Sequence, residues 1–155
     1  MNERWLPLVL GVAWAMGTAL LGASLTTIGP WYQGLARPWF QPPDWAFGPA
    51  WTLIFALSGY ALMRAWRAGA RGLLLGVFVL NGLLNALWSF LFFTWQRPDW
   101  ALVELVPLWL SILAMILLTA RHDRVAAWCI IPYIAWVSFA GALNLAIVRL
   151  NGPFG

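Results

Sequence analysis

Long apolar runs separated by short polar breaks make up most of this chain. A helix needs roughly 20 mainly apolar residues to cross the hydrocarbon core of a membrane. Five runs reach that length, and they cover residues of about 5–26, 46–66, 73–95, 100–120 and 125–148. The last three breaks are short, so we expect helices that follow one another to be antiparallel and adjacent. The pattern predicts an all-α membrane protein, a five-transmembrane-helix bundle that forms one domain over residues 1–155.

The segment between the first two runs has a different character. Together with the start of the second run it forms a stretch from Pro30 to Trp51 that holds four tryptophans and prolines at positions 30, 38, 42, 43 and 49. Proline fixes φ and removes a hydrogen-bond donor, so we expect no ordinary helix or strand here. Disordered segments are poor in aromatic residues, whereas this one is rich in them. We therefore predict an ordered lid loop over residues of about 27–45 that closes a pocket.

Composition and charge support a membrane protein. Apolar residues make up 63% of the chain and charged residues only 9%, whereas soluble domains carry about 25% charged residues. All nine basic residues are arginines near the ends of the runs, where they anchor helices to headgroups rather than bind nucleic acid. Six arginines lie on the N-terminal side and three on the lid side. In a bacterial-type inner membrane this bias predicts a cytoplasmic N-terminus and an outward-facing lid.

Few residues offer acid–base or metal chemistry. His122 and Cys129 are the only residues of their types, so a zinc site of the usual kind lacks ligands and we expect no metal. Glu104 is the only acidic residue well inside a run, which makes it a functional candidate. It lies one turn from the start of its helix, so pairing with Arg97 or solvation at the interface explains it as well. We expect Asp44 to cap the N-terminus of the second long helix.

One face of the third predicted helix carries polar and aromatic side chains together. Its members follow one another at spacings of four, three and four, and they are Asn81, Asn85, Trp88 and Phe92. An amide in hydrocarbon is costly unless it is hydrogen-bonded, so this face points into the bundle. Hydrogen bonding between helices explains Asn81 as well as a ligand does.

Tryptophans from three predicted helices lie at similar depths on the lid side. The helical rise places Trp51, Trp88 and Trp136 in that half of the bundle, with Asn85 and Ala140 beside them. Trp136 and Ala140 are four residues apart and share a face. We predict a cavity walled by the three indoles, in which Asn85 is the polar group and Ala140 leaves room. Such a cavity suits a flat aromatic ligand, and a tetrapyrrole in it is held by stacking, shape and hydrogen bonds rather than through a metal.

Three segments resemble the TspO/translocator protein family, also called tryptophan-rich sensory proteins and formerly peripheral benzodiazepine receptors, and the likeness is to its bacterial-type members. They are W-Y-Q-G-L-A-R-P-W-F-Q-P-P-D-W-A-F-G-P-A-W-T at 31–52, N-A-L-W-S-F-L-F-F at 85–93 and P-Y-I-A-W-V-S-F-A-G-A-L-N at 132–144. The resemblance implies a five-helix bundle, commonly a homodimer, whose first loop caps a ligand cavity. It also implies binding of porphyrins, notably protoporphyrin IX, and of benzodiazepine-type ligands, with cholesterol as a ligand of animal members.

The resemblance also assigns residues to the ligand site. Matching pocket positions are Trp51, Asn85, Trp88, Trp136, Ala140 and Leu143, with Trp31 and Trp39 in the lid. We add Phe92 from the polar face, and Phe55, which stands where the family often has a tyrosine. Leu145 stands where the cholesterol motif of animal members requires a tyrosine, so that motif is incomplete.

Three functions remain open from the sequence. The first is a receptor or carrier for porphyrin-like ligands, acting in tetrapyrrole handling and stress sensing, with no other cofactor required. The second, implied by the resemblance, is light- and oxygen-dependent porphyrin degradation, with Trp51 and Trp136 as redox participants. The third is non-catalytic transport or scaffolding.

Small residues spaced by four in helix three (Gly72 and Gly76, Gly82 and Ala86) and in helix one (Ala13 and Gly17, Thr18 and Gly22) permit close helix contact. We expect the dimer to use helix three.

Overall fold

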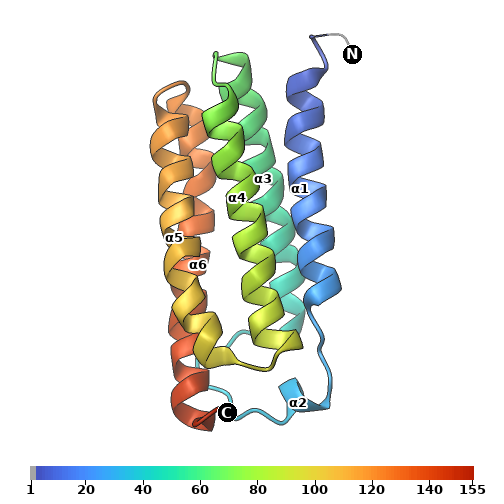
Figure 1. The fold of residues 1–155 in the computed structure, drawn as a ribbon, viewed down its shortest axis with the longest axis vertical. Helices are drawn as coiled ribbons and strands as arrows, with labels where there is room; N and C mark the ends of the chain where they lie inside the picture. The colour runs from blue at the N-terminus through green and yellow to red at the C-terminus, as the bar shows by residue number, and fades with distance from the viewer. Residues whose placement is uncertain (1–2) are drawn as a thin grey trace.

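Five long helices lie side by side in an elongated bundle, with the chain termini at opposite ends (Figure 1). The computed structural model describes residues 3–155, so residues 1 and 2 of the expected domain lie outside the described residues. The long helices are α1 (Leu6–Leu25), α3 (Phe47–Arg67), α4 (Gly72–Ser89), α5 (Pro98–Ala120) and α6 (Arg124–Asn151). Each of the five, with the short turns that adjoin α3 and α4, is long and apolar enough to cross a membrane. No strand occurs among residues 3–155, and the predicted fold class is confirmed.

The order of the helices around the bundle differs from their order along the chain. Helix α1 packs against both α3 and α4, α3 packs against α6, and α5 packs against α4 and α6, which closes a ring. The expectation that consecutive helices are adjacent is therefore wrong for α3 and α4. Helix α1 lies between them because it offers small residues to one neighbour and an indole to the other.

Glycines and a tryptophan fix the position of α1. Gly11 and Gly59 bring the backbones of α1 and α3 into contact, and a Cβ on either residue would clash with the carbonyl group of the other. On its other side, Trp14 Nε1 donates a hydrogen bond to the Phe78 carbonyl of α4 at 2.6 Å. A Cβ on Gly82 would lie 2.8 Å from Thr18 Oγ1. The small residues at Thr18 and Gly82 thus serve packing within the chain.

The lid-side end of α4 is not an ordinary helix. The sequence predicts one helix to about residue 95, but α4 ends at Ser89 and continues as a π-helical turn, η2 (Phe90–Thr94). A π turn accommodates an extra residue and so changes the direction of the side chains that follow. Here it carries Phe92 and Phe93, which both line the cavity described below.

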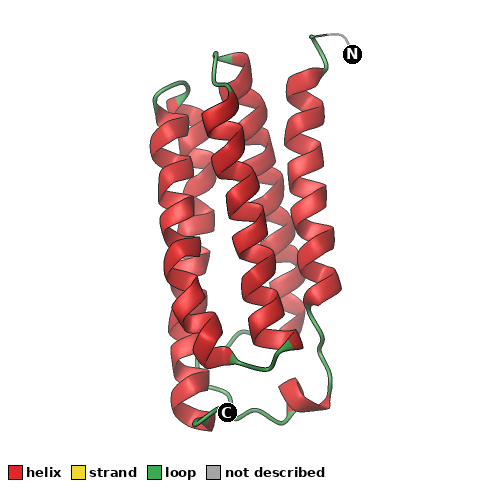
Figure 2. Cartoon of the chain, in the orientation of Figure 1, coloured by secondary structure: helices red, strands yellow, loops and turns green. Residues whose placement is uncertain are grey.

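The loop between α1 and α3 crosses the lid end of the bundle (Figure 2). It contains a four-residue helix, α2 (Pro30–Gln33), so the expectation of no helix is wrong for these residues. Pro30 stands at the first helical position, where a missing N–H costs little. Asn151 at the end of α6 holds the loop by both backbone groups of Ala36, with bonds of 2.8 Å from the N–H and 2.9 Å to the carbonyl.

Asp44 begins the 3-10 turn η1 (Asp44–Ala46) that leads into α3. Its side chain makes no capping hydrogen bond, so the expected N-cap is wrong. The carboxylate instead accepts hydrogen bonds from the Tyr32 hydroxyl and from Arg37 Nη1, both at 3.3 Å. Gln41 Nε2 donates to the same Tyr32 hydroxyl at 3.2 Å. Asp44 therefore joins Tyr32 and Arg37 of the lid directly to the start of α3, and Gln41 through the Tyr32 hydroxyl.

An ion pair closes the opposite end of the bundle. Arg64 Nε at the end of α3 donates to Asp123 Oδ2 at 2.7 Å. Asp123 also caps α6, because its other oxygen accepts from the Ala126 N–H at 3.0 Å. The hydrogen bond from Arg64, followed by that from Ala126, lowers the pKa of the Asp123 carboxyl below its usual value.

Candidate functional site

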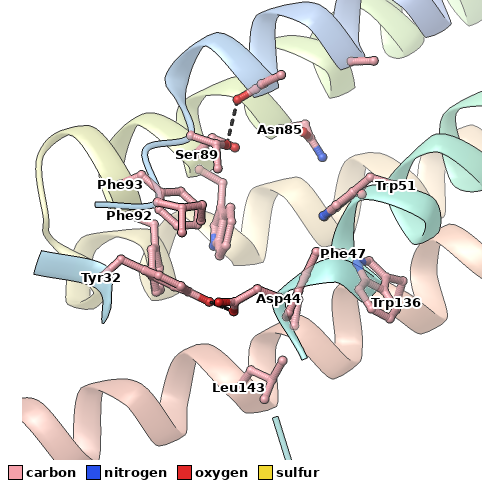
Figure 3. A pocket seen from close by; sticks show the side chains of 18 of the residues that line it. Tyr32, Asp44, Phe47, Trp51, Asn85, Ser89, Phe92, Phe93, Trp136 and Leu143 are labelled. Carbon is pink, nitrogen blue, oxygen red and sulfur yellow. Dashed lines mark hydrogen bonds between the residues drawn. The ribbon is translucent and has the colours of Figure 1, made fainter. Parts of the chain in front are cut away.

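A cavity of about 530 Å³ lies inside the ring of helices at the lid end (Figure 3). Its walls come from α1, α3, α4 with η2, and α6, and the lid contributes Tyr32, Gln41 and Asp44. The volume lies within the range of about 300–1,000 Å³ that small-molecule sites occupy. The cavity is the best-formed candidate site among the residues that the structure describes.

Most residues expected in the site surround this cavity. Those that line it are Trp51, Phe55, Asn85, Trp88, Phe92, Trp136, Ala140 and Leu143. The two lid tryptophans do not. Trp39 is 95% exposed and packs its ring on Phe40. Trp31 packs edge-on against Phe92 with ring centroids 6.2 Å apart, so it supports a lining residue from behind.

Helices α3 and α6 form one aromatic wall. Trp51 stacks on Phe55 with centroids 5.3 Å apart and 24° between the planes. Its edge meets Trp136 at 6.4 Å and 86°, and Phe47 covers Trp136 from the lid side at 5.8 Å. Edge-to-face contacts of this kind fix the ring orientations. Trp51 and Trp136 both lie at the cavity (Figure 3) rather than among acyl chains.

Helix α4 and its π turn form a second aromatic wall. Trp88 and Phe92 are stacked with centroids 5.1 Å apart and 26° between the planes. Phe93 packs against Phe92 at 4.8 Å. The cavity therefore has aromatic side chains on two sides, which favours an aromatic guest.

A chain of hydrogen bonds runs from the cavity wall into the bundle. Asn85 Nδ2 donates to the Tyr133 hydroxyl at 3.0 Å, and this hydroxyl donates to Asn81 Oδ1 at 3.0 Å. Asn81 Nδ2 then donates to Ser111 Oγ at 2.9 Å. Asn81 thus serves contact between helices, whereas Asn85 both joins the chain and lines the cavity. Sequence reasoning did not identify Tyr133, whose hydroxyl connects the two amides.

Asn144 of α6 is a second residue that the sequence analysis missed. With its amide turned so that donors meet acceptors, Nδ2 donates to the Pro98 carbonyl at 2.9 Å. Its Oδ1 accepts from Trp88 Nε1 and from the Leu102 N–H, both at 3.2 Å. Asn144 lines the cavity and holds Trp88 against α5. Its position, four residues after Ala140 on the same face of α6, is a signal that could have identified it.

One indole donor in the wall is unused. Trp136 Nε1 is buried and has no acceptor among the residues that the structure describes. A buried indole N–H normally has a partner. A ligand with an acceptor atom near this wall would supply one.

The lid side of the cavity is polar. Tyr32 is buried beneath Arg37, whose guanidinium lies 4.8 Å from the centre of the ring. Burial, reinforced by the neighbouring Asp44 carboxylate, raises the pKa of the Tyr32 hydroxyl above its usual value. Tyr32 therefore remains a neutral hydrogen-bond donor to Asp44 at physiological pH.

Glu104 lies apart from the cavity lining. It is 7% exposed, and neither carboxyl oxygen has a partner among residues 3–155. The expected pairing with Arg97 is wrong, because Arg97 binds Asp99 through two hydrogen bonds of 2.9 and 2.6 Å. The described part of the chain contains no group of three or more His, Cys, Asp or Glu side chains placed to hold a metal ion.

Comparison with known proteins gives consistent similarities. The sequence pattern of the TspO/MBR family matches residues 6–150. The tryptophan-rich protein TspO of Archaeoglobus fulgidus is 37% identical over 150 residues, which cover 94% of this chain and 97% of that protein. The tryptophan-rich sensory protein of Cereibacter sphaeroides is 32% identical, with coverage of 97% and 95%. The translocator protein of Sus scrofa is 30% identical, with coverage of 97% and 94%.

Proposed function

The chain belongs to the TspO/MBR family as an integral, multi-pass membrane protein, and we propose that it binds a porphyrin-like ligand in the cavity beneath its lid. The observation that carries the proposal is the pair of aromatic walls, Trp51 with Trp136 on one side and Trp88 with Phe92 on the other. Aromatic side chains on two sides favour a planar aromatic guest, because such a guest can stack on one ring and meet another edge-on. The names of the relatives, sensory protein and translocator protein, accord with a receptor or carrier. That its ligands are tetrapyrroles and that it acts in stress sensing are parts of our proposal.

The polar groups suit a guest with a few acceptors. Trp136 Nε1 is an unused donor in the wall, and Asn85 offers a fixed amide whose Nδ2 is already bound to Tyr133. Stacking, shape and these hydrogen bonds would hold the ligand without a metal–protein bond. Phe55 adds a ring to the aromatic wall, and because it has no hydroxyl it offers the ligand no hydrogen bond.

A porphyrin titration tests the proposal. The detergent-solubilised protein is titrated with protoporphyrin IX while tryptophan fluorescence is followed. We expect saturable quenching, which the double variant Trp51→Phe with Trp136→Phe weakens. The matched control is Trp100→Phe with Trp128→Phe, two exposed indoles that do not line the cavity. Quenching that does not saturate with protoporphyrin IX, or quenching that is equal in the two double variants, would contradict the proposal.

A second candidate function rests on the contact between Trp51 and Trp136. Their ring centroids are 6.4 Å apart at the cavity, so a bound porphyrin would meet two adjacent indoles that can donate electrons. In light-dependent degradation an indole would give one electron to the photoexcited porphyrin, which would pass it to dioxygen as superoxide. The indole radical cation would then take an electron back from the porphyrin, and superoxide would add to the resulting porphyrin radical cation, so that the net change is the addition of one dioxygen to the porphyrin. Illumination of the complex in air should give a new product spectrum that Trp136→Phe abolishes. Bleaching that is equal in this variant would leave binding as the only supported function.

Assembly and orientation complete the proposal. Gly72 and Gly76 of α4 face open space, with exposed Leu73 and Leu80 nearby on the helix, and we propose that this surface forms a homodimer. Substitution Gly76→Trp should yield monomers in multi-angle light scattering, and Gly17→Trp should not. The arginine bias supports a cytoplasmic N-terminus in a bacterial-type inner membrane, and reporter fusions at the two termini test this orientation.

A further inference from the structure

The wall of the cavity is incomplete between α1 and α3 at the lid end. Leu20 and Ala23 of α1, and Gly48 and Thr52 of α3, line the cavity and are also exposed, as are Ile28 and Asp44 in the lid segments that adjoin these helix ends. Leu20 is 64% exposed. A residue that meets both conditions lies at an opening, so the four helix residues border a gap through which the cavity reaches the surface that faces lipid.

The two helices are in close contact at one end, and their facing residues are exposed toward the lid end. Thr52 and Gly59 are seven residues apart and share a face of α3. At Gly59 this face is in backbone contact with Gly11 of α1, whereas at Thr52 it is exposed. On α1, a Cβ at Gly59 would lie 3.0 Å from Ala15, yet Ala23, two turns further on, is exposed. The opening therefore lies at the lid end of this helix pair, away from the glycine contact.

The border of the gap is suited to acyl chains. Three of the four helix residues have no polar side-chain atom. Thr52 Oγ1 donates to the Gly48 carbonyl at 2.8 Å, so its hydroxyl is satisfied within its own helix. Polar groups without partners are costly in hydrocarbon, and this border exposes few of them. A Cβ at Gly48 would meet nothing within 4 Å, so a larger side chain can be placed at this position without a clash.

Hydrogen bonds hold the lid in place, whereas the border of the gap is mostly apolar. Asn151 binds both backbone groups of Ala36, and Asp44 accepts hydrogen bonds from Tyr32 and Arg37. A ligand that arrived from water would have to break several of these bonds. A ligand that arrived from the bilayer would only displace the side chain of Leu20 and the lipid beside it.

We propose that the planar ligand reaches the cavity laterally, from the lid-side leaflet of the membrane, through the gap between α1 and α3, and that Leu20 and Gly48 set the width of this gap. The inference rests on the proposed function for the identity of the ligand. It predicts that these two positions control the rates of binding and release. Because the gap is the path in both directions, association and dissociation change together.

The experiment measures protoporphyrin IX exchange with the full chain in lipid vesicles, by stopped-flow tryptophan quenching. Gly48→Leu narrows the gap and should slow association and dissociation by about tenfold, whereas Leu20→Ala widens it and should accelerate both by about threefold. The matched controls are Gly17→Leu and Leu21→Ala. These residues are exposed on α1, a Cβ at Gly17 meets nothing within 4 Å, and neither residue lines the cavity.

The outcomes separate the route from the function. Opposite rate changes in the two gap variants, with wild-type rates in the controls, support the lateral route. If binding is saturable but neither gap variant changes the association or dissociation rate, the lateral route is wrong and the proposed function still stands. If Asn151→Ala accelerates association and dissociation while the gap variants do not change them, the path lies at the lid. If wild-type protein shows no saturable quenching, the proposed function fails and the route fails with it.

Discussion

Asn85 in α4 donates a 3.0 Å hydrogen bond to the hydroxyl of Tyr133 in α6, and this bond connects the cavity wall with the interior of the bundle. Tyr133 is fully buried, and its hydroxyl donates a hydrogen bond to Asn81 Oδ1, so one hydroxyl satisfies two amides. The orientation of Asn85 toward a ligand therefore depends on a residue that does not line the cavity.

Replacement of this hydroxyl is the first prediction. Tyr133→Phe leaves the Asn81 carbonyl and the Asn85 amide without their shared partner, which should lower the free energy of unfolding by about 1–3 kcal/mol. Thermal unfolding in one detergent measures the change. The control is Tyr60→Phe, because Tyr60 is 44% exposed and its hydroxyl lies 3.3 Å from Arg64 Nη1. Equal losses in the two variants would show that the buried chain has no special importance.

The second prediction concerns the residue that holds Trp88. Asn144→Leu keeps similar bulk but removes the acceptor of the Trp88 indole N–H. The freed ring should lose its fixed stacking on Phe92, and we expect porphyrin affinity to fall by about tenfold, the effect of one hydrogen bond. Fluorescence titration gives the Kd.

The matched control for Asn144 is Ser138→Ala. Ser138 accepts the indole N–H of Trp109 at 2.9 Å, which is the same kind of bond at a position that does not line the cavity. Affinity should be unchanged in this variant. If both variants bind equally, Asn144 does not act through Trp88.

The sequence predicted the five long helices because run length alone reports a membrane span. It also placed Asn85, Trp88 and Phe92 on one face, since helical spacing determines which side chains share a direction. The cavity required one further step, the comparison of depths along antiparallel helices. Trp51 and Trp136 meet at that common depth.

Other features depend on contacts that spacing does not encode. The π turn at Phe90–Thr94 has no signature in the apolar pattern, because a continuous helix of the same composition is equally hydrophobic. The sequence places both Trp39 and Trp31 in the lid. Only the path of the loop determines that Trp39 is exposed and that Trp31 packs against Phe92. Asn151, beyond the predicted end of the last helix, fastens a segment 115 positions away.

The third prediction tests this fastening. Asn151→Ala removes both bonds to Ala36, so amide exchange in the lid should accelerate by about five- to thirtyfold, the equivalent of about 1–2 kcal/mol. Hydrogen–deuterium exchange of peptides from residues 27–45 measures it. The control is Ser24→Ala, whose hydroxyl binds only the Leu21 carbonyl of its own helix. Unchanged exchange in Asn151→Ala would mean that the Asp44 contacts alone hold the lid.

The last prediction concerns the ion pair at the far end of the bundle. The hydrogen bond from Arg64 lowers the pKa of Asp123 in the folded protein, so the folded state binds a proton there less tightly than the unfolded state does. The contribution is fully present above the unfolded-state pKa of about 3.9, and it is lost as pH falls through the lower folded-state value. Unfolding temperatures measured in a zwitterionic detergent should therefore drop more steeply below about pH 4 in wild type than in Asp123→Asn. Glu3→Gln, which removes an exposed carboxyl, should retain the wild-type slope. A parallel decline in wild type and Asp123→Asn would show that the acid sensitivity arises elsewhere.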